Sequence, residues 1–539
     1  MNIVESLKLK IQATLIKLNQ EASLNDIIIE KSKDTSHGDY ASNVAMKFAR
    51  AFSKSPRDVA SLIVSNIDME GIEKIEIAGP GFINFFMKND SLQAVVTKII
   101  KEEDQYGRLD RKNLKVNVEF VSANPTGLLH VGTARGAAIG DSLCRILDFA
   151  GYDVTREYYI NDAGSQITNL ALSIQARYQE LFGIKSEIPE DGYAGQDIID
   201  IAKLIKDEIG DKALNMSNPI TYFKERGMKI ELDRIVKDLE TFRVRFDVFS
   251  SEKEIRKDNA IEKEIAYLKD YVYEADNALY LKTTAFVDDK DRVIKKSNGD
   301  YTYFMPDICY HVNKLSRGFD NIIDILGADH HGYINRMKSA LMMHGYKEDT
   351  LHVELIQMVR FLKNGVEYKA SKRRGDAITL RDVCEEVGVD SMRYFFAMRA
   401  ASTHLDFDMD LAIEQSANNP VFYAQYAHAR LCSVLEQGKD IAIDESAKLL
   451  SAPSEMALLK HLADFSKIVE DAAKEKAPYK ITNYIHALAE LVHAFYTECR
   501  VVDRDNLELS GSRLALVKAS KIVLKNALTL VGVSAPIHM

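Results

Sequence analysis

The sequence predicts an α/β protein in which a parallel-sheet domain is flanked by a small α+β domain and an all-helical domain. Two βαβ patterns, at 115–160 and 321–360, and continuous helical periodicity near the end of the chain support this prediction. At roughly 150 residues per domain, the 539 residues suffice for three or four domains. We expect these domains to span 1–108, 109–404 and 405–539.

The first domain alternates between helical and strand-like patterns. Apolar residues recur at helical spacing within 1–20, and the short apolar runs at 27–30, 72–79 and 82–87 are typical of strands. A polar stretch at 104–115 has the composition of a linker. These patterns predict a small α+β unit.

Each βαβ pattern of the second domain consists of two apolar runs around a helical segment. The expected strands are 115–121 and 153–160 in the first unit, and 321–326 and 352–359 in the second. Because the strands of a βαβ unit run parallel, these segments predict a parallel sheet.

Two further regions have helical patterns. Residues from about 165 to 300 are charged and helical, with a β-like patch at 280–289, and we interpret them as an insertion in the second domain. From 405 to the end, only three glycines interrupt the helical periodicity, which predicts a helical bundle.

Composition excludes several classes of protein. The net charge of −10 means that any binding to a polyanion must rely on local basic patches. The five cysteines include no CxxC pair, which argues against a zinc ribbon and against a disulfide framework. No apolar run approaches the 18 or so residues of a membrane span, and the N-terminus has no signal pattern. We expect a cytoplasmic protein that does not contact membranes and holds no zinc.

The turn after the first expected strand, SANPTGLLHVGTARG (122–136), has the composition of a ligand site. Ligands of parallel sheets bind at the carboxyl ends of strands, where this turn lies. Gly127, Gly132 and Gly136 allow a ligand close to the backbone, and His130 is a candidate donor to a phosphate. The alternative is a glycine-rich turn with a packed histidine.

A second candidate site is the basic segment YKASKRRG (368–375). It places Lys369, Lys372, Arg373 and Arg374 within six residues, and such a loop can clamp a polyphosphate. The alternative is a solvated charged loop.

Together and in this order, the two segments resemble the signatures of the class I aminoacyl-tRNA synthetases. HVGT (130–133) stands at the position of the first signature and KASK (369–372) at that of the second. Within that class the chain resembles the arginyl-tRNA synthetases over essentially its whole length. The blocks that carry this resemblance are VEFVSANPTGLLHVG, REYYINDAGSQ (156–166), YTYFMPDICYH (301–311), GADHHGY (327–333), DSMRYFFAMR (390–399) and NPVFYAQYAHAR (419–430).

The resemblance implies three functional domains. It implies a tRNA-contacting domain at 1–108, a Rossmann-like catalytic domain at 109–404 and an anticodon-binding domain at 405–539. The implied reaction is the activation of L-arginine by ATP to arginyl-adenylate and its transfer to the terminal adenosine of tRNA(Arg), releasing AMP and pyrophosphate. Magnesium is expected with the ATP, and no editing function is expected of the insertion.

The resemblance also implies roles in ATP chemistry for single residues. Thr133 replaces the second histidine of the first signature, and its hydroxyl can bind a phosphate but carries no charge. For Asp329 the alternative role is a helix N-cap. The implied catalytic residues are His130, Thr133, Lys369 and Lys372, and the implied ATP contacts are Gly132, Gly327, Asp329 and Ser371.

Arginine recognition requires a carboxylate, because a guanidinium binds carboxylates through two parallel hydrogen bonds. Asp307, four residues after Tyr303, matches the family's guanidinium-binding pair, and its alternative role is a surface salt bridge. The family's glutamine in this region is His330 or His331 here. The implied arginine-binding residues are Glu119, Ser122, Asn124, Tyr303, Asp307 and His331.

The implied tRNA contacts lie in the two outer domains. Phe82 is the stacking candidate and Asn84 the hydrogen-bonding candidate, although apolar neighbours in FINFFM more often fill a core. In the third domain, contacts are expected from one helix. Its candidates are Tyr423, Gln425 and Arg430, with Asn419 and Tyr426 at helical spacing beside them.

Two rival interpretations remain at the level of sequence. A cysteinyl-type class I synthetase would need zinc ligands that the chain lacks, and a catalytically inactive tRNA-binding paralogue is supported only by Thr133. The family resemblance further implies a monomer and an arginine activation step that requires tRNA.

Overall fold

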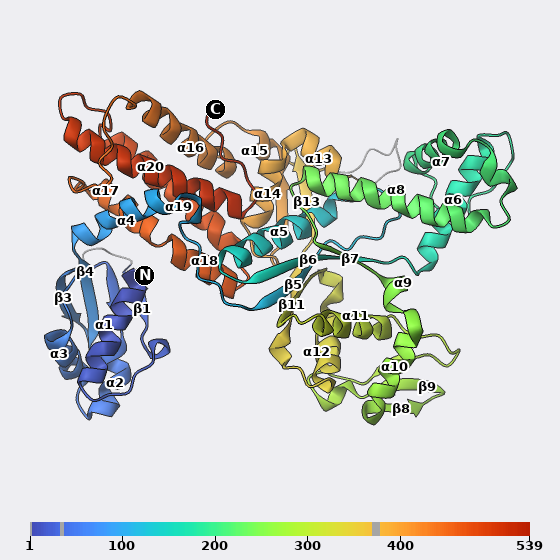
Figure 1. Ribbon diagram of the computed structural model, residues 1–539, viewed down its shortest axis with the longest axis horizontal. Coiled ribbons are helices and arrows are strands. Elements are labelled where there is room, and N and C mark those ends of the chain that lie inside the picture. The colour runs from blue at the N-terminus through green and yellow to red at the C-terminus, as the bar shows by residue number, and fades with distance from the viewer. Residues whose placement is uncertain (1–2, 33–36, 369–377) are drawn as a thin grey trace.

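A five-stranded parallel sheet lies in the middle of the chain, in the order β12-β11-β5-β6-β7 (Figure 1). The structure is a computed structural model and describes residues 3–32, 37–368 and 378–539. The strands are β5 (Lys115–Glu119), β6 (Asp153–Ile160), β7 (Val248–Ser251), β11 (Asn321–Gly327) and β12 (Leu351–Ile356). Both predicted βαβ units contribute to this one sheet, and the predicted fold class is confirmed.

Helices cover both faces of the sheet, which explains its apolar inner strands. Val116 and Val118 of β5 and Ile322 and Ile323 of β11 are buried. Helix α5 (Ala134–Phe149) lies between the sheet and the C-terminal helices. Helices α11 (Phe304–Ser316) and α12 (Ile334–Met343) pack below the sheet in Figure 1.

The expectation of one continuous insertion at 165–300 is wrong, because β7 lies within that range and pairs in parallel with β6. A four-residue strand in a charged stretch is too short to show a strand pattern. Of the β-like patch at 280–289, only the end of β9 is a strand. The elements before β7 are α6 (Ser165–Glu180), α7 (Gln196–Ile209) and α8 (Pro219–Thr241), and those after it are α9 (Glu252–Ile255), α10 (Ala260–Tyr267), β8 (Val272–Ala275), β9 (Ala278–Leu281) and β10 (Arg292–Lys295).

The third expected domain also differs at its start. Residues Leu405–Asp408 form a strand, β15, which pairs in parallel with β13 (Val359–Lys363), and β13 pairs with β14 (Val366–Glu367). Helices α13 (Leu380–Val387) and α14 (Val389–Ala397) precede this strand. The helical region begins only after it, with α15 (Met409–Ile413), α16 (Pro420–Gln437), α17 (Pro453–Ala463), α18 (Phe465–Lys474), α19 (Tyr479–Glu498) and α20 (Leu507–Leu530). No helix within the described ranges is long and apolar enough to cross a membrane.

The N-terminal domain is a four-stranded antiparallel sheet with three helices, and its core is separate from that of the rest of the chain. Ile11, Ile63 and Phe85 are buried in it. The strands follow the order β1-β2-β4-β3. The elements are α1 (Ile3–Lys17), β1 (Ile29–Lys31), β2 (Tyr40–Ser42), α2 (Val44–Phe52), α3 (Pro56–Asn66), β3 (Ile72–Ala78) and β4 (Phe82–Met87).

Helix α4 (Asn89–Glu102) packs mainly with the C-terminal helices, although the predicted boundary at 108 assigns it to this domain. It packs against α17 and α20, and Val96 and Ile99 are buried in the large C-terminal core. The N-terminal core ends at Met87. The predicted boundary is therefore too late for the packing, because sequence pattern shows that a helix is amphipathic but not which core it joins.

The guanidinium of Arg393 joins the central and C-terminal parts of the chain. Its side chain is fully buried, and its Nη2 donates to the Asp141 carboxylate at 2.5 Å. It also donates to the carbonyls of Phe242 at 2.9 Å and Val531 at 3.1 Å. Removing one partner of such a buried network leaves unpaired polar groups, which costs several kcal/mol.

Gly532 is required beside this guanidinium, and we expect Gly532→Ala to destabilise the protein. Its φ of +70° is unfavourable for a residue with a Cβ, and a Cβ there would collide with the Arg393 guanidinium. The combined cost should exceed about 2 kcal/mol and lower the thermal unfolding midpoint by at least about 2 °C.

Gly345→Ala is the matched control, since Gly345 has a φ of +83° but nothing within 4 Å of the added Cβ. It should show only the cost of the backbone conformation. Equal shifts of the two midpoints in scanning calorimetry would contradict the role of the Arg393 contact.

Candidate active site

The turn that follows β5 has a strained backbone. Val121 has a φ of 68° and Ser122 a φ of 41°, values that non-glycine residues rarely adopt. The Ser122 hydroxyl accepts a hydrogen bond from the Tyr159 backbone N–H and donates to Glu119 Oε1, both at 3.0 Å. Further along the turn, Asn124 donates to Gln166 Oε1 at 2.6 Å. Such strain persists only where surrounding contacts impose it, and it is common at functional sites.

His130 has a defined tautomer. Its Nδ1 accepts the Gly132 backbone N–H at 2.9 Å, so in the neutral ring the proton is on Nε2. Partial burial lowers the pKa of His130, which favours that neutral form. The Nε2–H is therefore a donor suited to a phosphate oxygen.

The same contact corrects one expectation for the first signature. The Gly132 N–H already donates to His130, so the ATP contact implied for Gly132 cannot be made through a free backbone donor in this structure. Glycine is needed here because a Cβ would lie 2.9 Å from His130 Nδ1. Thr133 begins α5 as its N-cap without a side-chain capping hydrogen bond.

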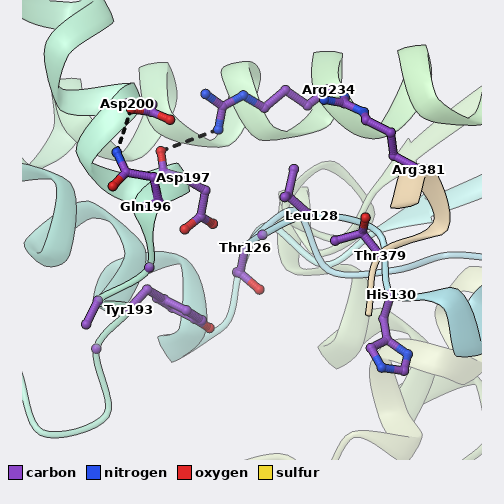
Figure 2. Close-up of a pocket in the computed structure, with 14 residues that line it drawn as sticks. Thr126, Leu128, His130, Tyr193, Gln196, Asp197, Asp200, Arg234, Thr379 and Arg381 are labelled. Atoms are coloured by element: carbon purple, nitrogen blue, oxygen red, sulfur yellow. Dashed lines mark hydrogen bonds between the residues drawn. The ribbon is translucent and has the colours of Figure 1, made fainter. Parts of the chain in front are cut away.

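A cavity of about 800 Å³ lies next to this turn (Figure 2). The turn at 126–130 forms one wall, and the loop before α7 forms the opposite wall with Tyr193 and Gln196. Arg234 of α8 and Arg381 of α13 complete it. Among the described residues, His130 and Gly127 are the ones singled out from the sequence that line this cavity.

Carboxylates form a row across the carboxyl ends of three strands. In the register of the sheet, Glu119 of β5 lies beside Asp324 of β11 and beside Glu157 of β6. Lys314 of α11 donates to Glu119 Oε2 at 2.5 Å and to Asp324 Oδ1 at 2.9 Å. Arg317 donates to both oxygens of Glu157, at 2.9 and 2.7 Å. The end of α11 thus supplies two cations that pair with these three carboxylates.

Asp307, in the first turn of α11, is a different kind of carboxylate. Burial, together with the Glu119 and Glu252 carboxylates, raises its pKa to about 7, and His311 only partly offsets this. Among the described residues, no Lys or Arg forms an ion pair with Asp307. A cation that enters this site would favour its ionised form.

Sequence reasoning missed several side chains around Asp307. The pKa of Tyr333 is raised well above its ordinary value, first by burial and then by Asp307 and Asp324, so its hydroxyl lies near these carboxylates. His311 Nε2 contacts Asp324 Oδ2 at 2.7 Å. The spacing of His311 and Lys314, four and seven residues after Asp307 on one helix, is the signal that would have found both.

The remaining predicted substrate contacts are exposed. Tyr303 is 81% exposed at the start of α11, and the Asp329 side chain is 84% exposed after β11. The N-cap of that turn is Gly327, so Asp329 does not have the capping role considered as its alternative. His331 is also exposed. Lys369, Ser371 and Lys372 lie outside the described residues.

The N-terminal candidates for tRNA contact separate into an exposed and a buried residue. Phe82, at the start of β4, is 40% exposed, as a stacking platform requires. Asn84 is only 6% exposed within an inner strand of the sheet, so the hydrogen-bonding role expected for it is not available in this structure.

Two C-terminal candidates are also already engaged. Asn419 is buried and caps α16, accepting from the Val421 and Phe422 N–H groups. The Gln425 amide donates to Asp390 Oδ2 at 2.9 Å and to the Ser534 carbonyl at 3.0 Å. Both side chains therefore serve the fold rather than present a free surface.

Tyr423 and Arg430 instead belong to an aromatic surface formed by α16 and α19. The Arg430 guanidinium lies 5.1 Å from the Tyr426 ring and 4.4 Å from the Tyr496 ring. The Tyr423 ring lies 4.6 Å from that of His493. His493 and Tyr496 were not predicted, because their pattern on α19 is that of an ordinary amphipathic helix.

Comparisons with known protein families cover almost the whole chain. Residues 95–432 match "tRNA synthetases class I (R), catalytic domain", 5–87 match "Arginyl tRNA synthetase N terminal domain" and 424–539 match "DALR anticodon binding domain".

Individual relatives match over their full length. The chain is 50% identical to an arginine–tRNA ligase of Bacillus subtilis (strain 168), covering 100% of both chains. It is 51% identical to arginine–tRNA ligase 2 of Bacillus thuringiensis subsp. konkukian, covering 99% of this chain and 98% of the relative.

Solved structures agree with this assignment. The structure of a putative arginyl-tRNA synthetase from Campylobacter jejuni aligns with a TM-score of 0.78 at 33% identity, covering 84% of this chain and 100% of that one. The Thermus thermophilus arginyl-tRNA synthetase shares the fold over 100% of both chains, with a TM-score of 0.76 at 21% identity. Half of the sequence is thus shared with full-length relatives, and the chain belongs to the arginyl-tRNA synthetases, class I enzymes with arginine–tRNA ligase activity.

Proposed function

We propose that the carboxyl ends of β5 and β11, with the start of α11, bind arginine for its activation by ATP and its transfer to tRNA(Arg). The observation that carries this assignment is Asp307, a carboxylate whose pKa is raised to about 7 by burial and by the nearby Glu119 and Glu252 carboxylates, and with which no Lys or Arg of the described residues forms an ion pair. A guanidinium offers five N–H donors in one plane and pairs with carboxylates through two parallel bonds. Arginine supplies the cation that this pocket lacks.

In the first step, a carboxylate oxygen of arginine attacks the α-phosphorus of ATP and pyrophosphate leaves. ATP enters as its magnesium complex, which is the substrate. The Nε2–H of His130 donates to a phosphate oxygen, and Thr133 contributes a hydroxyl without charge. From the sequence, we assign Lys369 and Lys372 to the charge that develops as pyrophosphate leaves.

The remaining substrate contacts are assigned from the places of these residues in the fold. Gly327 and Asp329, exposed at and just after the end of β11, contact the nucleotide together with Ser371. Ser122 and Asn124 bind the α-amino end of arginine. Tyr303 and His331 are exposed beside the site, where bound substrate would cover them.

In the second step, a ribose hydroxyl of the terminal adenosine attacks the carbonyl carbon of the adenylate and AMP leaves. The cavity of about 800 Å³ adjoins His130 and is large enough for a nucleotide, and we assign it to the approaching acceptor end. Phe82 and the Tyr423–Arg430 surface provide stacking contacts elsewhere on the tRNA. We place the enzyme in the cytoplasm and expect a monomer, as the family resemblance implies.

Asp307→Asn should remove most of the affinity for arginine. A neutral amide cannot pair with the guanidinium through two charged bonds, a loss of about 2–4 kcal/mol, or roughly 30- to 1000-fold in the arginine KM. The ATP KM should stay near that of the wild type in arginine-dependent pyrophosphate exchange.

Asp300→Asn is the control for this substitution, because Asp300 is an exposed carboxylate in the turn shortly before α11. It should leave both KM values unchanged. An Asp307→Asn enzyme with a near-normal arginine KM would place the guanidinium elsewhere.

Arginine binding should weaken as the pH falls through neutrality. The pKa of Asp307 is about 7 in the free enzyme, above its ordinary value of 3.8, so below pH 7 the carboxyl is increasingly protonated and loses its attraction for the guanidinium. Between pH 7 and 6 the affinity should fall by up to about tenfold. Isothermal titration calorimetry at several pH values measures this, and uptake of arginine near pH 7 should release a proton. A flat profile from pH 8 to 6 would contradict the assigned pKa.

Arginine activation should require tRNA. The arginine contacts come from several strand ends and loops, so a population in which they are misaligned would bind ATP without reacting. Pyrophosphate exchange with nuclease-treated protein, ATP and arginine should be slow and should recover on addition of tRNA(Arg). Full-rate exchange without tRNA would mean that the pocket is preformed.

A further inference from the structure

We propose that Lys314 is a positioning residue for arginine, which acts through Glu119 to hold the strained turn at Val121 and Ser122 in its binding conformation. This inference rests on the proposed arginine site at Glu119, Ser122 and Asn124. Lys314 lies beneath that site and does not itself contact substrate in this assignment.

Lys314 is held by ion pairs to two neighbouring strands. Its side chain is 0% exposed, and its Nζ lies 2.5 Å from Glu119 Oε2, 2.9 Å from Asp324 Oδ1 and 4.4 Å from the centre of the Tyr310 ring. A buried ammonium is tolerated only where anionic partners surround it. Both partners of Lys314 are carboxylates.

The position of these carboxylates makes a cation necessary. Glu119 and Asp324 are direct neighbours in the register of β5 and β11, so their side chains lie on the same face of the sheet. Like charges at such positions repel each other. The ammonium of Lys314 between them offsets this repulsion and holds the Glu119 carboxylate in place.

The second carboxylate oxygen of Glu119 contacts the strained turn directly. Glu119 Oε1 accepts the Ser122 hydroxyl at 3.0 Å, and the same hydroxyl accepts the Tyr159 N–H at 3.0 Å. Val121 and Ser122 have φ values of 68° and 41°. Such a backbone conformation costs free energy and persists only where surrounding contacts impose it. The path from Lys314 to the turn therefore consists of two successive side-chain contacts.

A purely structural role for Lys314 makes a different prediction. A salt bridge that only stabilises the fold would, when removed, lower stability and affect both substrates alike. A positioning role affects arginine selectively, since the turn carries arginine contacts, whereas the ATP contacts come from His130 and the end of β11.

The test uses a double substitution that leaves the net charge of the buried cluster unchanged. Lys314→Met/Asp324→Asn removes one cation and one anion from the cluster, and Asp324→Asn alone is its matched control, because it retains the contact between Lys314 and Glu119. Thermal unfolding establishes that each variant is folded. Wild-type exchange is measured first with tRNA(Arg) present, and a wild type without arginine-dependent exchange would refute the proposed function itself.

We expect Lys314→Met/Asp324→Asn to raise the arginine KM at least about tenfold over Asp324→Asn, with the ATP KM within about twofold. Equal changes in the two KM values, or no change in either, would overturn the positioning role.

A double-mutant cycle with Ser122→Ala tests the path. If Lys314 acts through Ser122, the two substitutions should be strongly non-additive, so that Lys314→Met has less than about a threefold effect on kcat/KM for arginine once Ser122 is alanine. The cycle is run in the Asp324→Asn background, so that it does not depend on the folding of Lys314→Met alone. Additive effects would overturn the path through Ser122.

Discussion

Because β5 and β11 run parallel and pair directly, segments about 200 residues apart in the chain end at the same edge of one sheet, with Glu119 beside Asp324. Every other feature of the proposed arginine site follows from that pairing. The turn at Val121 and Ser122 leaves the edge from β5, the GADHHGY turn leaves it from β11, and α11 passes beneath both. A shift of one residue in this register would move Glu119 to the opposite face and separate the carboxylates from their cations.

The carboxylates at this edge are of two kinds: those paired with cations of the protein itself, and one without a Lys or Arg partner among the described residues. Lys314, Arg317 and His311 pair with Glu119, Asp324 and Glu157 within the protein, whereas no Lys or Arg of the described residues pairs with Asp307. In the proposed site, selectivity for a cationic amino acid comes from this one carboxylate rather than from a generally acidic pocket. A lysine side chain, as a point charge, cannot fill the two parallel acceptor positions that a guanidinium fills.

The sequence was sufficient to predict the fold class, the helix after the first turn and most long strands, because these segments have a clear hydrophobic period. It was insufficient for β7 and β15, which have four residues each, and for α4, whose partners lie at the far end of the chain. Within the site, residue types and motifs indicated His130, Glu119 and Asp307, whereas Lys314, Tyr333 and His493 depend on which elements become neighbours. The burial of Asn84 and the capping role of Asn419 likewise arise from tertiary packing that a local pattern does not contain.

The packing of α4 has a consequence for synthesis on the ribosome. The N-terminal domain has its own core and can fold as soon as it emerges. The apolar face of α4, with Val96 and Ile99, packs mainly against α17 and α20, which are translated near the end of the chain. The nascent chain therefore carries an exposed apolar helix through most of its elongation, a state that favours aggregation and binding by chaperones. The order in which the chain is made thus differs from the order in which its core is completed.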